Sequence, residues 1–234
     1  MKPKKNPKPQ PVLHGIPDEA GPVCVIIGSG ISLTFDDINE ARDRFPSAYF
    51  IVIQDAYVLA PWADTLYFCD YKWINWHYDS VLTKFAGEVA TIDVAAVNKY
   101  EGEFTHIACV DAQRETIPGL CPSNGAIHHG YSSGYQAMHI ARNRGFDKIV
   151  LLGMDYGATG RGHFFGSHPD NSDQNSDFRT MVRAFNDAAP QLAAEGVRVI
   201  NCTPQTALQC FPRMTLAQAC AEFTAASPVH NEAE

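Results

Sequence analysis

The clearest indication of fold class is the segment Val23-Cys24-Val25-Ile26-Ile27-Gly28-Ser29-Gly30. An unbroken apolar run without polar alternation is typical of a parallel strand that is covered on both faces. The glycines that follow end the run and allow the backbone to come close to a ligand. The sequence therefore predicts a buried first strand with a binding turn at its carboxyl end.

Similar apolar runs recur along the chain and alternate with helical patterns. We expect further strands at 49–53, 65–69, 89–92, 106–110, 148–152 and 197–200, and helices at 34–45, 56–59, 73–85, 133–143, 177–194 and 216–223. Alternation of strands and helices with few hairpin signals requires crossover connections. The predicted fold is a single doubly wound α/β domain, with a mostly parallel sheet and helices on both faces.

The two ends of the chain differ in composition from this alternating part. The start is basic and rich in proline, and the end is small and polar, so neither can bury a core. We expect a flexible arm at 1–20, a nucleotide-binding catalytic domain at 21–223 and a flexible tail at 224–234.

Composition limits the partners and the compartment. The net charge of −8 does not favour nucleic acid as a partner, except through the basic arm. The 7 cysteines form no CxxC pair and are expected to be free thiols of a reducing compartment. No signal peptide is recognisable, and no apolar run approaches the roughly 20 residues that span a bilayer. We predict a soluble, cytoplasmic protein without a membrane partner, and the sequence is compatible with a homo-oligomer.

Ligands of open parallel sheets lie beyond the carboxyl ends of the strands. Glycine amides, serine hydroxyls and helix-start amides at this edge suit a phosphate group. A tight turn that merely needs glycine is the alternative, because the first turn is no P-loop and Leu33 replaces the third glycine of a GxGxxG fingerprint. The predicted nucleotide-binding residues are Gly28, Ser29, Gly30, Ser32, Gln54, Asp55, Asp70, Ser132, Ser133, Gly134, Gly153, Tyr156, Asn201 and Thr203.

The loop after the strand at 148–152 carries the candidate catalytic groups. Histidine exchanges protons near neutral pH, so we predict His163 and His168 as catalytic residues together with Asp155 at the strand end. Arg161 in the same loop is a candidate substrate contact. The spacing of the two histidines is not that of a metal-binding helix, and we predict no metal ligands. A surface loop with incidental histidines is the alternative.

A dense aromatic segment precedes the middle of the chain. Trp73, Trp76 and His77 are candidate substrate contacts, because indole rings can form a stacking wall for a base or a sugar. Core packing of the tryptophans is the competing interpretation.

Three blocks of sequence resemble a known superfamily. They are residues 27–33, 132–137 and 149–156, and together they are similar to the bacterial sialyltransferases of the Campylobacter type and to the MptE-like (DUF115) proteins. With the segments 55–57, 60–64 and 73–77 added, the chain looks closer still to uncharacterised phage-encoded proteins. The resemblance extends over residues 22–212.

This resemblance implies a Rossmann-like domain that holds a nucleotide against the first glycine turn. The sialyltransferases have the pattern Gly-Asn-Gly-Pro-Ser there, where this chain has Ser29 and Ile31 at the second and fourth positions. They also carry a catalytic histidine in the loop where His163 and His168 stand here, and they need no metal. The implied reaction is transfer from a small-molecule nucleotide-sugar donor, with a loop histidine as general acid or base. A phage origin would place the protein in the host cytoplasm.

Two alternatives stay open at this point. An MptE-like pyrophosphokinase would use Mg²⁺, with Asp70 or Asp155 as ligands and a heterocyclic alcohol stacked on Trp73 or Trp76. A phage protein that binds a nucleotide without turning it over is the third hypothesis.

Overall fold

The computed structural model describes residues 22–111, 117–160, 162–166, 168–170 and 176–225. The predicted arm at 1–20, the predicted tail from residue 226 onward and Arg161 lie outside these residues. Among the helices described, none has the length and apolar character that crossing a membrane requires.

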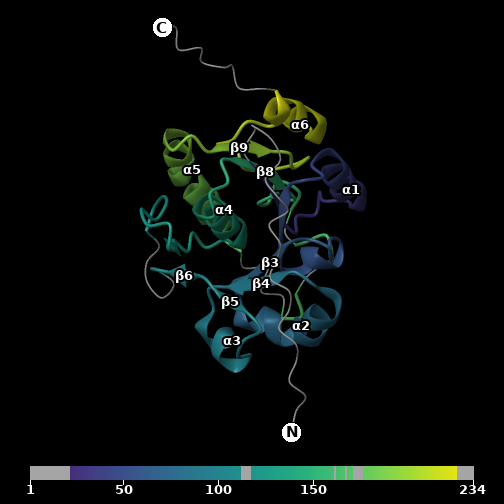
Figure 1. Ribbon diagram of the computed structural model, residues 1–234, viewed down its shortest axis with the longest axis vertical. Helices are drawn as coiled ribbons and strands as arrows, with labels where there is room; N and C mark the ends of the chain where they lie inside the picture. Colours follow the sequence, from purple (N-terminus) through teal and green to yellow (C-terminus); the bar gives the residue numbers. More distant parts are fainter. Residues whose placement is uncertain (1–21, 112–116, 161, 167, 171–175, 226–234) are drawn as a thin grey trace.

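A seven-stranded sheet forms the centre of the molecule (Figure 1). Every neighbouring pair in it runs parallel. The order across the sheet is β5 (Thr105–His106), β4 (Glu88–Thr91), β3 (Thr65–Phe68), β2 (Tyr49–Ile53), β1 (Val23–Ile27), β8 (Lys148–Leu152) and β9 (Arg198–Asn201). This order confirms the predicted doubly wound, Rossmann-like fold.

Helices cover both faces of the sheet (Figure 1). The core on one face includes residues of α1 (Phe35–Arg44), the 3₁₀ helix η1 (Gln54–Val58), α2 (Tyr71–Lys84), α3 (Val94–Lys99) and α6 (Leu216–Thr224). On the other face lie α4 (Ser133–Asn143) and α5 (Phe178–Ala194). Val25 and Ile27 of β1 belong to the first core and Cys24 and Ile26 to the second, and all four are fully buried. The strand is apolar at every position because both of its faces are covered.

Two local predictions differ from the structure. The single strand expected at 106–110 is interrupted at Ile107, so that β5 joins the main sheet while β6 (Ala108–Cys109) pairs with β7 (Ala126–Ile127). The partner β7 lies inside a stretch rich in glycine and polar residues for which neither a strand nor a helix was predicted. Helix α3, capped by Asp93, was not expected, because six residues are too short for a periodic pattern.

The connections create one reversal point in the sheet. From β1 the chain builds outward through β2, β3, β4 and β5, and it then returns to place β8 on the other side of β1. The backbone amide of Gly28 donates to Leu152 O (2.8 Å) where these two strands end. Ligands of doubly wound sheets bind in the crevice outside such a reversal.

His139 of α4 gives the fold a predictable response to acid. Its side chain is fully buried, and its Nε2 accepts a hydrogen bond from the Cys121 amide (3.1 Å). Burial, with smaller contributions from His128 and Arg142, lowers the pKa of His139 from 6.5 to about 3. Between these two pKa values, His139 is therefore protonated in the unfolded chain and neutral in the folded protein. The free energy of unfolding should decrease as the pH falls from 6.5 toward 3.

A His139→Gln variant should lose this part of the pH dependence, since glutamine can accept the same hydrogen bond without titrating. We expect its unfolding free energy, measured by urea denaturation, to depend on pH less steeply than that of the parent, by up to about 1.4 kcal/mol per pH unit. The exposed His106 provides the control variant His106→Gln. Parallel pH profiles for the parent and His139→Gln would contradict the prediction.

Candidate functional site

A cavity of about 300 Å³ opens at the carboxyl edge of β1 and β8. It is bordered by the ends of several strands, by the first turns of α4 and α5, and by the loop that follows β8. Most of the predicted site residues meet here: Gly28, Ser29, Gly30, Gln54, Asp70, Ser132, Ser133, Gly134, Gly153, Asp155, Tyr156, His163 and His168.

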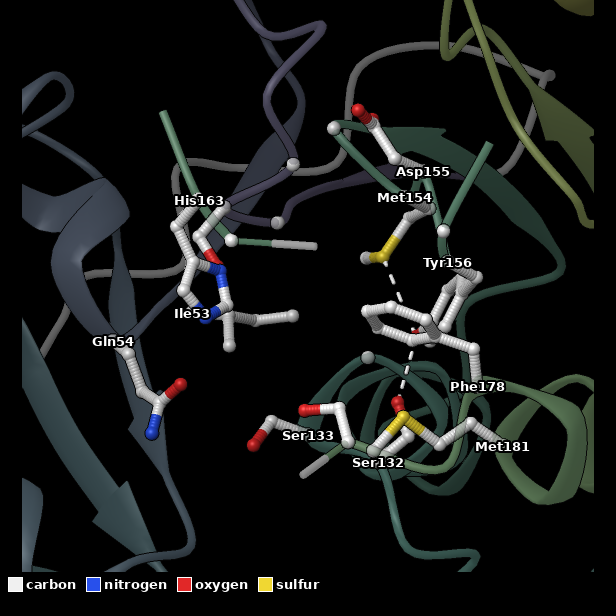
Figure 2. Close-up of a pocket in the computed structure, with 18 of the residues that line it drawn as sticks. Ile53, Gln54, Ser132, Ser133, Met154, Asp155, Tyr156, His163, Phe178 and Met181 are labelled. Atoms are coloured by element: carbon white, nitrogen blue, oxygen red, sulfur yellow. Dashed lines mark hydrogen bonds between the residues drawn. The ribbon is translucent and has the colours of Figure 1, made fainter. Parts of the chain in front are cut away.

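The cavity has two chemically different sides (Figure 2). Met154, Phe178 and Met181 form an apolar side of thioether and aromatic groups. His163 and Gln54 lie across from it, and the hydroxyls of α4's first turn lie between the two sides. Such a cavity can hold a ligand with a flat apolar part and a polar part.

The glycine turn shapes the cavity but does not direct its glycine amides into it. Gly28 N donates to Leu152 O (2.8 Å) and Gly30 N donates to Gly153 O (2.9 Å). The expectation that these two amides bind an anion is therefore corrected, because carbonyl groups of the β8 segment already accept from them.

Glycine is required at these two positions for close packing. A Cβ atom on Gly28 would lie 2.5 Å from Gly153 O, and one on Gly30 would lie 2.1 Å from Asp155 Oδ1. Neither residue has a positive φ. The turn therefore needs the absence of a side chain and not the conformational freedom of glycine.

Asp155 holds the glycine turn in place. Its side chain is buried, and its carboxylate accepts hydrogen bonds from Ser32 N (2.8 Å), Ser32 Oγ (2.6 Å) and Thr159 Oγ1 (2.7 Å). Figure 2 shows the carboxylate directed away from the centre of the cavity. We assign Asp155 and Ser32 to positioning the turn, in place of the predicted catalytic and nucleotide-binding roles.

Two further predicted residues, Asn201 and Thr203, position the backbone next to the cavity. Thr203 Oγ1 accepts from Met154 N (3.0 Å), and the Thr203 amide donates to Asn201 Oδ1 (3.0 Å). Neither Asn201 nor Thr203 lines the cavity. They fix the backbone of the turn that carries Met154 and so act on the site indirectly.

The start of α4 provides hydrogen-bond donors. The amides of the first helical residues, Ser133 and Gly134, have no acceptor within the helix, and the helix dipole makes this end positive. Both residues line the cavity. Ser132 caps the helix and shares a hydrogen bond with the Tyr156 hydroxyl (2.6 Å). A helix start of this kind is suited to a phosphate or carboxylate.

Cys69, at the end of β3, lies beside this helix start. Its Sγ is 3.1 Å from Ser133 Oγ, and burial raises the pKa of the Cys69 thiol to about 11. The thiol is therefore protonated near neutral pH, which argues against a nucleophilic role.

His163 is attached directly to the glycine turn. Its Nδ1 lies 2.9 Å from Ser29 Oγ, and the next amide, Phe164 N, donates to Ser29 O (3.1 Å). The imidazole stacks on Phe165 with a centroid distance of 4.8 Å, and the His168 ring lies 4.9 Å away. The two loop histidines and the turn thus form one cluster at the cavity.

Unfavourable backbone conformations are concentrated around the same cavity. Among the described residues other than glycine, those with positive φ are Gln54 (46°), Tyr131 (55°) and Tyr156 (49°), and all three line it. Each such conformation costs about 1–3 kcal/mol and persists where the surrounding structure imposes it, often at functional sites. This observation supports the site independently of the chemistry of its side chains.

In the aromatic segment at the start of α2, Trp73 and His77 contribute mainly to packing. Trp73 is fully buried, and its indole N–H donates to Asp55 (2.7 Å), whose carboxylate also lies 3.5 Å from His77 Nε2. The rings of His77 and Trp73 stack at 4.8 Å. We assign Trp73, His77 and Asp55 to the packing of α2 against the sheet, since none of them lines the cavity. Trp76 is 39% exposed, lies 6.2 Å from the His168 ring and does not line the cavity.

Several cavity residues were not predicted from the sequence: Ile53, Cys69, Tyr131, Ser176, Phe178 and Met181. The sequence could have indicated Phe178 and Met181, because they lie in the first turn of α5, the helix that follows β8, and β8 ends at the cavity. Asp70 was predicted and lines the cavity, while its carboxylate caps α2 through Lys72 N (2.8 Å). In the part of the chain that the structure covers, no group of three or more His, Cys, Asp and Glu side chains is arranged to hold a metal.

The chain matches no known family profile and no curated protein. Among solved structures it is similar to a short chain dehydrogenase from Mycobacterium smegmatis, with 13% identity, a TM-score of 0.28 and coverage of 92% of each chain. Because this likeness is weak, the fold assignment rests on the strand order and the parallel pairing described above.

Proposed function

We propose that the protein is a nucleotide-dependent transferase that binds a nucleotide-sugar donor in this cavity and passes the sugar to an acceptor hydroxyl. One observation carries the proposal: a single cavity at the reversal point of the sheet joins a helix start that can bind phosphate to a histidine held by Ser29.

The phosphates of the donor would lie at the start of α4. The amides of Ser133 and Gly134 and the Ser133 hydroxyl can donate to them. The amide of Ser29 can contribute as well, because no oxygen of the described residues accepts from it. A nucleobase would pack against Phe178 and Met181, since thioether and aromatic groups contact flat rings favourably.

His163 would exchange the proton of the transfer step. The acceptor oxygen attacks the anomeric carbon of the sugar, its proton passes to the imidazole, and the bond from that carbon to the phosphate oxygen breaks with its electron pair. The nucleotide leaves with that oxygen. Ser29 Oγ can donate to or accept from Nδ1, so it orients the ring in either tautomer. His168 borders the same cavity and is the alternative acid or base.

The Mg²⁺-dependent pyrophosphokinase is not favoured by a specific observation. The carboxylates of its two expected metal ligands are already engaged, that of Asp70 by the Lys72 amide and that of Asp155 by Ser32 and Thr159.

A thermal-shift screen tests the proposal. At a concentration about 100 times its Kd, a ligand of the folded state stabilises it by about 2.7 kcal/mol, which corresponds to roughly 5–10 °C for a chain of this size. We expect a CMP-, UDP- or GDP-sugar to give such a shift in the presence of EDTA. ATP with Mg²⁺ and NAD form the comparison arms.

Matched variants locate the binding. Ser133→Ala should reduce the shift, whereas Ser47→Ala, at an exposed position that does not line the cavity, should leave it unchanged. A shift with ATP and Mg²⁺ alone would support the pyrophosphokinase instead. The proposal fails if no nucleotide sugar stabilises the protein.

A further inference from the structure

A second hollow lies directly beside the cavity, against the first turns of α5. Its volume is about 400 Å³, and its lining includes Arg179, Arg183 and Asn186. It also includes Tyr156 and Phe178, which line the first cavity as well. The two spaces are therefore neighbours that share a wall.

Two arginines give this hollow a positive charge. Arg179 and Arg183 are exposed and stand four residues apart on α5, so they lie on the same side of the helix. No acidic side chain of the described residues forms an ion pair with either arginine. Asp187, which lies one turn further along α5, also forms no ion pair with them. The nearby Asp177 caps the helix through Thr180 N (3.2 Å) and Thr180 Oγ1 (2.6 Å), and its carboxylate also attracts the exposed Arg179 without forming an ion pair with it.

The position of these charges is unfavourable for α5 itself. Arg179 lies in the first turn, at the positive end of the helix dipole, where a cation is repelled, and Arg183 follows it in the second turn. The chain as a whole has a net charge of −8, so acidic side chains for pairing are abundant elsewhere. Two exposed cations that form no ion pair with the described residues, beside a hollow that adjoins the candidate site, are suited to an anion that comes from outside the protein.

We propose that this hollow binds an anionic group, a phosphate or a carboxylate, of the acceptor substrate. The guanidinium groups of Arg179 and Arg183 can each donate two parallel hydrogen bonds to such a group, and the Asn186 amide can add another. The shared wall of Tyr156 and Phe178 places the body of the acceptor next to the donor cavity. The description of the ligand as an acceptor rests on the proposed function, whereas anion binding itself does not.

An NMR titration of the ¹⁵N-labelled full chain tests the inference. The probes are glucose 6-phosphate, glucuronate and neutral glucose, which separate a phosphate, a carboxylate and no charge. We expect saturable shifts of the side-chain Nε–H signals of Arg179 and Arg183 with one or both anions and none with glucose. The double variant Arg179→Gln/Arg183→Gln should weaken this binding by about tenfold or more. Arg198→Gln, at an exposed arginine of β9, should bind like the parent.

The same spectra distinguish this inference from the proposed function. The backbone amides of Ser133 and Gly134 report on nucleotide sugars at the donor cavity, independently of the arginine signals. If these amides respond to a nucleotide sugar and the arginines respond to neither anion, the inference is overturned and the proposed function stands. If only the arginines respond, the anion site stands and the proposed function fails. Equal arginine shifts with glucose and with the anions would also overturn the inference.

Discussion

Replacing His163 by alanine is expected to lower turnover by about 10²- to 10⁴-fold, because the transfer step would lose its acid or base. His163→Asn is the sharper variant, since its amide can keep the hydrogen bond to Ser29 Oγ but cannot exchange a proton. Both variants should bind the donor with nearly unchanged affinity, because most of the phosphate contacts that we propose come from α4. The measurement is the steady-state rate with the nucleotide sugar identified by the thermal-shift screen.

The control for His163 is His106→Ala, at an exposed histidine of β5 that does not line the cavity. Its turnover and melting temperature should match those of the parent. His168→Ala tests the second loop histidine in the same assay, and a loss confined to that variant would transfer the catalytic role to His168. Full activity in both single alanine variants and in the double variant would refute a catalytic role for this loop.

Gly30→Ala should destabilise the fold by about 3 kcal/mol, a melting temperature lower by roughly 6–12 °C, and should abolish donor binding. The new Cβ would lie 2.1 Å from Asp155 Oδ1 and 2.8 Å from Gly153 O. Relieving these overlaps displaces the carboxylate that holds Ser32, and the turn then moves with it. Calorimetry and the thermal-shift assay measure the two effects.

Gly125→Ala is the matched control for Gly30→Ala. Neither glycine has a positive φ, and the Cβ of an alanine at position 125 would meet only Ser123 Oγ, at an ordinary 3.5 Å. Its stability should lie within about 0.5 kcal/mol of the parent. Equal melting temperatures for the two variants would show that the close approach of Gly30 to Asp155 does not constrain the turn.

The architecture could be predicted from the sequence because both faces of the central strands are covered. That burial makes β1, β2 and β8 apolar at nearly every position, and such runs are visible without knowledge of their neighbours. The pairing of β6 with β7 could not be predicted, because strands of two residues carry no periodic signal.

The location of the candidate site was also predictable, whereas the direction of its donors was not. Strand ends and helix starts are local features, and they indicated most of the cavity. The amides of Gly28 and Gly30 point toward β8 because that strand, more than a hundred residues later in the sequence, pairs with β1. Similarly, burial of Trp73 depends on its packing against Phe68 and Tyr57, which the composition of the aromatic segment does not reveal.

The double connection between Ser29 and the loop at 162–166 has a consequence for engineering. Ser29 holds His163 through its hydroxyl and Phe164 through its carbonyl, so the histidine loop is attached to the glycine turn at two points. A loop taken from another protein and inserted after β8 would arrive without its anchoring serine. Anyone who wishes to exchange this loop must therefore transplant the first turn together with it.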